Sequence, residues 1–326
     1  MERFLNIETF LQRTMTEQQL QARSKQEVLI LPCGYVDAHG NCHYEVELEP
    51  ITGKEEEFLI DVPVDMHSAH IVTRLLSACI KRIGIITGPD QSLIRDLLIR
   101  DRDYLIIKLR EMTFGKKVEI VLYCPDVSCG KAMDVTFSLE DMQIERKPVS
   151  KLFFTIQFPG PEDKEKQYNS VEFRLPTGGD QEAVASFAGV NEKSAVNHLL
   201  ARCIRSVGQN SSIDEAQITQ LSDSVRREIE EKMQQLAPLI DFEIDSVCPE
   251  CKKPFTFPLN FTDLFFAEMK RNFRTLEQEV HLLAWHYHWS ERDILSMNRK
   301  KRKRYVAFLE EEIEKLTEME SYKRGF

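Results

Sequence analysis

The sequence predicts an α+β protein made of two tandem copies of a hairpin–helix–helix–hairpin unit, followed by a C-terminal helical region. Three observations predict this class: the chain matches itself at one offset, each half carries a cysteine pair between two alternating strands, and residues 264–326 have helical apolar spacing. The 326 residues exceed one typical domain, and the 42% hydrophobic content is sufficient for a sizeable core. This composition excludes a wholly disordered chain.

The internal repeat is visible when the chain is shifted against itself by 124 positions. The aligned landmarks are residues 74–81 with 198–205, Gly84 with Gly208, and Cys124-Pro125 with Cys248-Pro249. The first pair shares the pattern Leu-Leu-x-x-Cys-Ile. A period this long exceeds that of solenoid repeats, so it predicts two domain-sized copies, residues 27–147 and 148–263. Residues 1–26 precede them as an N-terminal arm, and residues 264–326 follow as the helical region.

Each copy is predicted to open with a β-hairpin and to continue with two helical segments. The hairpin strands are apolar-rich and flank a polar loop, at residues 27–33, 42–49, 152–158 and 170–175. In the first helix Leu75, Leu76 and Cys79 lie on one face. The second helical segments span residues 90–102 and 214–235. Cys79 and its counterpart Cys203 are interpreted as small core residues.

A second hairpin is predicted to close each copy, with two cysteines at its tip. The strands span residues 118–123 and 132–139 in copy one, and 242–247 and 255–259 in copy two. The tips are Cys124-x4-Cys129 and Cys248-x2-Cys251. Two thiolates separated by a few residues in a turn can both point at one cation.

The candidate metal ligands are these four tip cysteines, Cys124, Cys129, Cys248 and Cys251. One pair alone cannot complete a closed site, and four thiolates in a tetrahedron are the preferred surroundings of structural zinc. We therefore expect one structural Zn²⁺ in a zinc-ribbon-like site that clamps the two copies together. A closed site leaves no position for water or a substrate, which argues against an enzyme. A redox-active pair and unmetallated thiols are the alternatives.

A second group of metal-type residues lies around the tip of the first hairpin: Cys33, His39, Cys42 and His43. Copy two has no counterpart to any of them. We interpret them as ordinary hairpin residues, with a second metal site as the alternative.

The C-terminal region is predicted to contain a helix over residues 264–287 and a last helix that includes Tyr305 and Leu316. Ser290 is expected to cap the chain where helix formation resumes, with Asp293 reaching back. The aromatic cluster Trp285–Trp289 is interpreted as a packed corner between helices rather than a ligand cage.

Charge argues against nucleic acid as the main partner, because the net charge is −10 and phosphate binding needs the opposite sign. One strongly basic run, Asn298–Arg304, precedes a cluster of glutamates. We interpret this run as a solvated helix face or a contact for an acidic protein partner. The alternative function is a zinc-ribbon nucleic-acid-binding regulator that uses residues 298–304. The Gln-rich arm 1–26 is interpreted as a segment that orders against a partner or stays loose.

No run of residues is apolar and long enough to span a membrane, and the first residues do not form a secretory signal. A cytoplasmic, reducing location is therefore expected, which suits cysteines as metal ligands or buried thiols. The sequence contains none of the common nucleotide-binding, serine-hydrolase or metalloprotease motifs, so no small-molecule substrate is expected. Residues 176–180 are interpreted as a turn with an N-cap rather than a phosphate site.

The order of several short motifs resembles one protein family. The motifs are Leu109-Arg-Glu111, Tyr123-Cys-Pro125, Arg174-Leu-Pro-Thr-Gly178, Cys248-Pro-x-Cys251, Glu279-Val-His-Leu-Leu283 and Trp289-Ser-Glu291. Over roughly residues 60–310 the chain is similar to the T-even-phage baseplate assembly family, whose hub-assembly chaperone-like members are also encoded beside phage-tail-like contractile injection systems. The resemblance implies a non-enzymatic part in building the baseplate, with hub, spike or wedge proteins as partners. The widened Cys124-x4-Cys129 loop and the long N-terminal arm depart from the family pattern.

Overall fold

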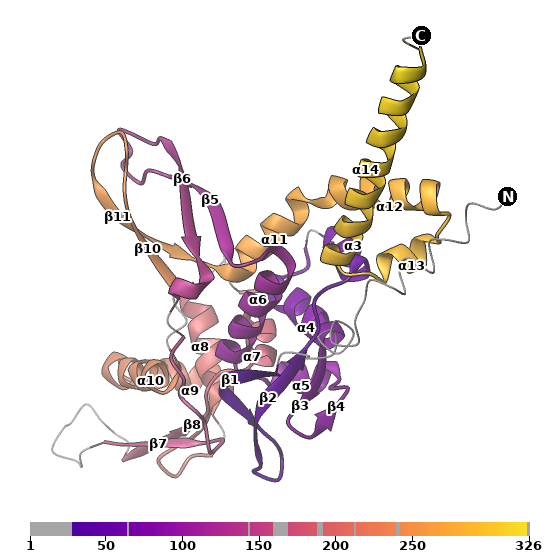
Figure 1. The fold of residues 1–326 in the computed structure, drawn as a ribbon. Helices are drawn as coiled ribbons and strands as arrows, with labels where there is room; N and C mark the ends of the chain where they lie inside the picture. The colour runs from indigo at the N-terminus through magenta and orange to yellow at the C-terminus, as the bar shows by residue number, and fades with distance from the viewer. Residues whose placement is uncertain are drawn as a thin grey trace.

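The computed structural model describes residues 28–63, 65–142, 144–158, 169–187, 192–211, 213–238 and 242–324. Within these ranges the protein is a mixed α+β fold in which small antiparallel sheets surround and project from a helical body (Figure 1). The predicted N-terminal arm lies outside the described residues. None of the described helices combines the length and the apolar character that crossing a bilayer requires.

The first sheet confirms the predicted opening hairpin. Its strands are β1 (Val28–Val36), β2 (Cys42–Leu48), β3 (Ile80–Ile83) and β4 (Ile86–Thr87), paired in that order. Two helices lie between β2 and β3: α3 (Gly53–Ile60) and α4 (Ser68–Cys79). Leu75 and Leu76 of α4 are fully buried, as the predicted apolar face requires.

The second sheet has the same order of elements. Its strands are β7 (Phe154–Gln157), β8 (Ser170–Phe173) and β9 (Ile204–Val207), and the helices between β8 and β9 are α7 (Gly178–Val184) and α8 (Glu192–Cys203). In both sheets the third strand starts directly after a helix and pairs antiparallel with the second strand, with one register irregularity. Cys79 and Cys203 end the two helices and are buried, so their interpretation as core residues is confirmed.

Three segments predicted as single helices are each broken into two. The pairs are α5 (Gln91–Asp96) with α6 (Ile99–Phe114), α9 (Glu215–Gln220) with α10 (Asp223–Leu236), and α11 (Phe261–Arg271) with α12 (Phe273–Tyr287). Leu98 and Leu221 adopt extended backbone conformations, and the Ser222 hydroxyl accepts the N–H of Val225 to start α10. Breaks of one or two residues hardly disturb apolar periodicity, so the sequence pattern missed them.

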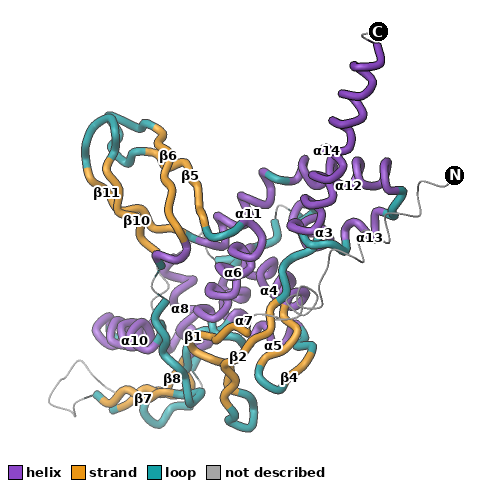
Figure 2. Tube along the Cα trace, viewed as in Figure 1, coloured by secondary structure: helices purple, strands orange, loops and turns teal. Residues whose placement is uncertain are grey.

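The two tip hairpins are confirmed. They consist of β5 (Lys117–Tyr123) with β6 (Ala132–Ser138) and β10 (Phe242–Val247) with β11 (Pro254–Leu259). Figure 2 shows these two ribbons of strand standing side by side beyond the helical body. A short 3-10 turn, η1 (Leu139–Asp141), ends β6 at the base of the first hairpin.

The C-terminal region ends in α13 (Glu291–Leu295) and α14 (Arg299–Arg324). Ser290 caps α13 by accepting the N–H of Asp293, as predicted. The aromatic corner is confirmed in part: the Trp289 ring lies 4.8 Å from Tyr287 and 4.9 Å from Tyr305. The prediction that Trp285 packs in this corner is wrong, because 70% of its surface is exposed.

Two hydrophobic cores cross the boundary between the sequence halves. The first core joins the first sheet, α4 and α6 to both tip hairpins and α11, through residues such as Val118, Ile244 and Phe265. The second core lies under β7–β9, α8 and α10, but it also includes Cys33 from β1. Since each core contains residues of both halves, the halves and the base of the tip hairpins are packed into one body.

Candidate metal centre

The four predicted cysteines converge at the joined tips of the two hairpins. The sulfur atoms of Cys124, Cys129, Cys248 and Cys251 all lie within 4.8 Å of one another. The Sγ–Sγ distance is 3.7 Å between Cys124 and Cys251 and 3.8 Å between Cys129 and Cys248. Four sulfurs at about 2.3 Å from a central zinc would be about 3.8 Å apart in a regular tetrahedron. The cluster therefore has the dimensions to hold a metal ion.

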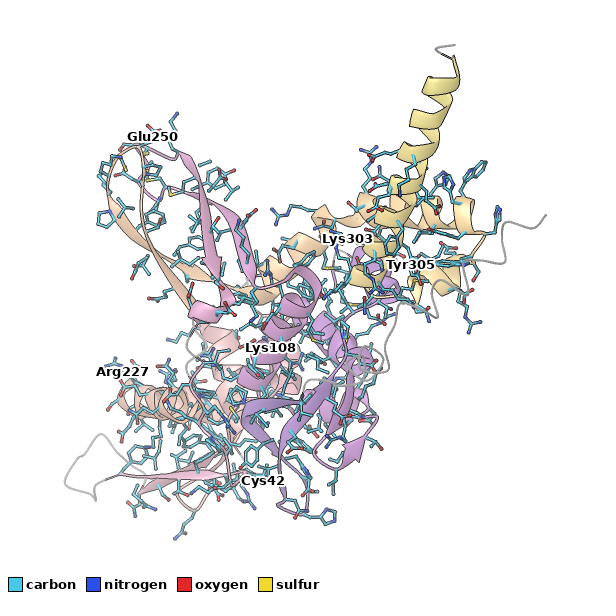
Figure 3. The ribbon with its side chains drawn as sticks, in the orientation of Figure 1. Cys42, Lys108, Arg227, Glu250, Lys303 and Tyr305 are labelled. Atoms are coloured by element: carbon cyan, nitrogen blue, oxygen red, sulfur yellow. The ribbon has the colours of Figure 1, made fainter. Side chains whose placement is uncertain are left out.

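Each tip is shaped by a compact turn that bends the chain back onto its strand. The Cys124 N–H donates to the Lys131 carbonyl at 2.9 Å, and the Cys248 N–H donates to the Lys253 carbonyl at 3.1 Å. Gly130 and Lys252 follow the second cysteine of each pair and both have left-handed backbones, with φ of 55° and 61°. These turns bring both sulfurs of each pair into the same cluster. Glu250, which is labelled in Figure 3, lies in the second tip between the two cysteines of its pair.

The longer first tip is closed by Asp126. Its carboxylate accepts the N–H of Ser128 at 2.9 Å, and its carbonyl accepts the N–H of Cys129 at 2.8 Å. The same carboxylate forms an ion pair with Lys253 of the second tip. The two extra residues of Cys124-x4-Cys129 are thus absorbed in an Asx turn, and Cys129 still reaches the cluster.

The pKa values of two of these thiols are shifted in opposite directions. Burial, together with contacts to the other sulfurs, raises the pKa of Cys124 to about 12. The N–H of Cys251 donates toward Cys248 and lowers the pKa of that thiol to about 7, against the opposing effect of burial. A divalent ion at the centre would supply the positive charge that deprotonates all four sulfurs.

The first hairpin does not gather a comparable group. Cys33 lies in the second core, whereas Cys42 is partly exposed and pairs with Val36 across the strands. His43 is buried and contacts the Asp37 carboxylate at 3.1 Å. Among the described residues, the tip cysteines form the only cluster with metal-ligand geometry.

The basic run 298–304 is only in part the predicted solvated face: Lys300, Lys301, Lys303 and Arg304 are exposed, but the two arginines between and before them are not. Arg299 and Arg302 are buried, with 5% and 0% of their surface exposed. Glu56 of α3 accepts from both guanidinium groups, at 3.2 Å and 2.5 Å. Glu279 of α12 accepts from Arg302 Nε at 3.0 Å. These two arginines are therefore internal counterions, which leaves four of the six basic side chains of the run on the surface.

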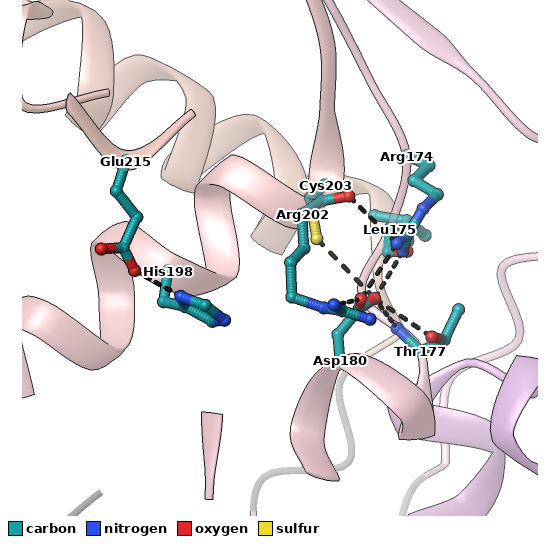
Figure 4. Close-up of polar contacts among 8 residues, drawn as sticks. All are labelled: Arg174, Leu175, Thr177, Asp180, His198, Arg202, Cys203 and Glu215. Carbon is teal, nitrogen blue, oxygen red and sulfur yellow. Dashed lines mark hydrogen bonds and ion pairs between the residues drawn. The ribbon is translucent and has the colours of Figure 1, made fainter. Parts of the chain in front are cut away.

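Another buried carboxylate, Asp180, was not identified from the sequence. It accepts from Arg174 Nη2, Arg202 Nε and the Thr177 N–H, each at 2.9 Å (Figure 4). The Thr177 and Asp180 side chains form a capping box, so the predicted turn with an N-cap over residues 176–180 is confirmed. The repeated Thr-Gly pair, Thr52-Gly53 and Thr177-Gly178, was the available sequence signal for this feature.

Asp180 predicts a measurable acid sensitivity. Burial alone would raise its pKa, but Arg174, Thr177 and Arg202 together lower the pKa from 3.8 to about 2. A lowered folded-state pKa stabilises the fold above pH 4, and this contribution of about 2 kcal/mol is lost between pH 4 and 2. Urea denaturation should therefore show Asp180→Asn less stable than wild type at pH 5, with the gap shrinking toward pH 2. The cysteines titrate in the same way in wild type and in Asp180→Asn, so they do not contribute to the difference in unfolding free energy between the two chains. A difference that stays constant from pH 5 to pH 2 would contradict this account.

The comparison with protein families agrees with this architecture. A family model described as T4 bacteriophage base plate protein matches residues 27–267. Searches of curated proteins and of solved structures found no match. The matched span contains both opening hairpins, both tip hairpins and all four clustered cysteines, and it ends within α11. The chain belongs to the T4 bacteriophage base plate protein family.

Proposed function

We propose that this protein is a zinc-stapled, non-enzymatic component or assembly chaperone of the baseplate of a phage-tail-like contractile injection system. The observation that carries the proposal is the convergence of four thiols from two hairpins in a chain of the baseplate family. A structural ion at this point would join the hairpins of the two halves into one rigid ribbon.

The metal assigned to this site is Zn²⁺, held by Cys124, Cys129, Cys248 and Cys251. Zinc is supported by the all-sulfur donor set and by the two Sγ–Sγ distances near the tetrahedral edge. Four protein ligands complete the coordination of zinc, so the ion would carry no reactive water. The role of the site is therefore structural.

We further propose that the body is a duplication, with copies at residues 27–147 and 148–263 and a helical region at 264–326. The same order of elements in both halves supports this division: hairpin, two helices, third strand, two helices and tip hairpin. The third-strand register supports it as well, because Ile83 pairs with Val46 and Val207 pairs with Val171 at equivalent places.

The expected partners are hub, spike or wedge proteins, and assembly is expected in the cytoplasm, where reduced thiols remain available for zinc. Family membership supports a baseplate partner. The duplication supports it too, since two related surfaces can engage two related neighbours.

The decisive experiment is capture of the tagged chain from its native producer while particles are being assembled. We expect hub, spike or wedge proteins to co-purify with the wild-type chain. The matched control is a tagged, unrelated cytoplasmic protein of similar acidity from the same cells. Recovery of no tail, spike or baseplate component above this control would refute the proposal.

A further inference from the structure

The last helix of the protein runs past the elements that support its first turns. Helix α14 spans Arg299–Arg324, a length of about 39 Å at the rise of an α-helix. Figure 1 shows its first half among α3, α12 and α13, whereas its second half extends away from the other labelled elements toward the C-terminus. We call residues 310–324 of this helix the distal segment.

One face of α14 holds its first half against the body. Arg302 is fully buried on this face and pairs with Glu279 of α12 at 3.0 Å. The Tyr305 ring contacts Tyr287 at the end of α12, with the ring centres 6.1 Å apart. Leu309, which lies seven positions after Arg302 and thus two turns further along the same face, is only 4% exposed. The covered part of the face therefore reaches Leu309.

The same face continues into the distal segment, where it loses its cover. Ile313 follows Leu309 by four positions and Leu316 follows Ile313 by three, which is the spacing that keeps apolar residues on one face of a helix. Ile313 is nevertheless 39% exposed, and the side chains of residues 310–315 are all exposed. Within the described ranges, no element covers the apolar face of α14 beyond Leu309.

The distal segment is acidic on both sides of this face. Residues 310–320 contain six glutamates and one lysine. Glu310 and Glu312 lie on opposite sides of the apolar face, because each is turned about 100° around the helix from the apolar residue next to it. Glu310 and Glu314 are like charges one turn apart, which disfavours an isolated helix. A positively charged neighbour would relieve this repulsion while it covers Ile313.

We propose that the distal segment of α14 binds a basic amphipathic helix of another baseplate protein. The apolar side of that helix covers Ile313, and its Lys or Arg residues lie against Glu310 and Glu312, as at the flanking positions of a coiled coil. The inference rests on the proposed baseplate role of the chain.

A second copy of this chain fits the distal segment less well than a basic helix does. Parallel pairing of two distal segments sets glutamate against glutamate. Antiparallel pairing would bring the acidic segment of one copy to the basic run of the other, but it also needs the apolar face around Leu309, which the body already buries. Charge and burial together therefore favour a partner that is itself basic.

The first test compares Ile313→Glu with Ile85→Glu in the full chain, by the same capture from the native producer. Ile85 is 84% exposed in the turn between β3 and β4, so Ile85→Glu makes the same change at a surface site outside α14. We expect Ile313→Glu to lose one baseplate component at least tenfold, because a charge replaces the centre of the apolar contact, whereas Ile85→Glu retains it. Both variants should keep the wild-type zinc content and melting temperature, since neither side chain belongs to a core.

A second pair of variants tests the charge of the occupant. Glu310→Gln with Glu312→Gln removes the two carboxylates beside the apolar face, whereas Glu311→Gln with Glu314→Gln removes two from the other side of the same helix. The net charge changes equally in both. We expect the first pair to weaken capture at least threefold at low salt and to reduce its salt dependence, and the second pair to leave both unchanged. Equal effects of the two pairs would overturn the assignment of a basic occupant.

Identity of the occupant is read by placing a photo-crosslinking amino acid at position 313 and sequencing the attached peptide. A segment of a baseplate protein with apolar residues at three- and four-residue spacing and an excess of Lys and Arg would support the inference. Attachment to a second copy, to residues 1–27 of the same chain, or to a segment without this pattern would overturn it. Unchanged capture by Ile313→Glu would also overturn it and leave the proposed function intact, whereas no capture by wild type would refute both.

Discussion

Cys248→Ser should release the zinc and loosen the two tip hairpins from each other. Cys248 is fully buried, and the Cys251 N–H lowers the pKa of its thiol, so its loss removes a ligand that ionises more readily than an ordinary cysteine. Binding of a structural zinc ion contributes on the order of 10 kcal/mol in small zinc modules. Even if only about 4 kcal/mol of this appears as stability here, the melting temperature of a chain of this length should fall by about 5 °C.

Metal analysis and calorimetry on the purified chains measure this effect. Wild type should contain one zinc per chain, and Cys248→Ser should contain almost none. Cys79→Ser is the matched control, because Cys79 is also a buried cysteine of the first core but lies at the end of α4 rather than at a hairpin tip. A Cys248→Ser chain that retains one zinc, or a Cys79→Ser chain that loses it, would contradict the assigned ligand set.

Arg302→Met should be the most damaging single change among the basic residues. Arg302 is fully buried, and its removal takes away the ion-pair partner of Glu279 and leaves Glu56 with Arg299 alone. Breaking a buried ion pair by removing one partner costs about 3–5 kcal/mol. The contact between α3 and the C-terminal helices should weaken with it, because Arg302 lies directly against Gly53.

Urea denaturation followed by circular dichroism measures this cost. Lys303→Met is the matched control: it removes one positive charge from the same run at an exposed position, so the free energy of unfolding should change by less than about 0.5 kcal/mol. Equal effects of the two changes would show that the basic run acts as a surface patch. A selective loss with Arg302→Met would show that its function is internal.

Short-range patterns in the sequence were sufficient for the hairpins and for the composition of the cysteine site. Alternating apolar residues predicted β5 and β10, and the spacing of Cys248 and Cys251 predicted a metal knuckle between strands. Caps such as Ser290 were also predictable, because a capping side chain bonds a backbone N–H only three residues away. These features depend on neighbours within one turn or one hairpin.

The breaks within helices were harder to predict from the sequence, because they do not interrupt the apolar periodicity. Leu98 leaves the helical conformation while α5 and α6 keep their apolar faces on the first core, so the periodicity continues across the break. The break is stabilised from outside by the Thr177-Gly178 turn, which belongs to the other half of the chain. A local pattern does not contain that contact.

By itself, the sequence determined the α+β class, the four thiols and the family resemblance, because each rests on residue types at short, fixed spacings. Only the tertiary structure decided that Arg299 and Arg302 are internal, since their partner Glu56 lies more than 240 positions away. It alone decided that Gly178 of α7 lies against Arg102 of α6, because these two residues are 76 positions apart in the chain. Burial of charge and covering of a surface are set by long-range packing, which residue spacing along the chain does not record.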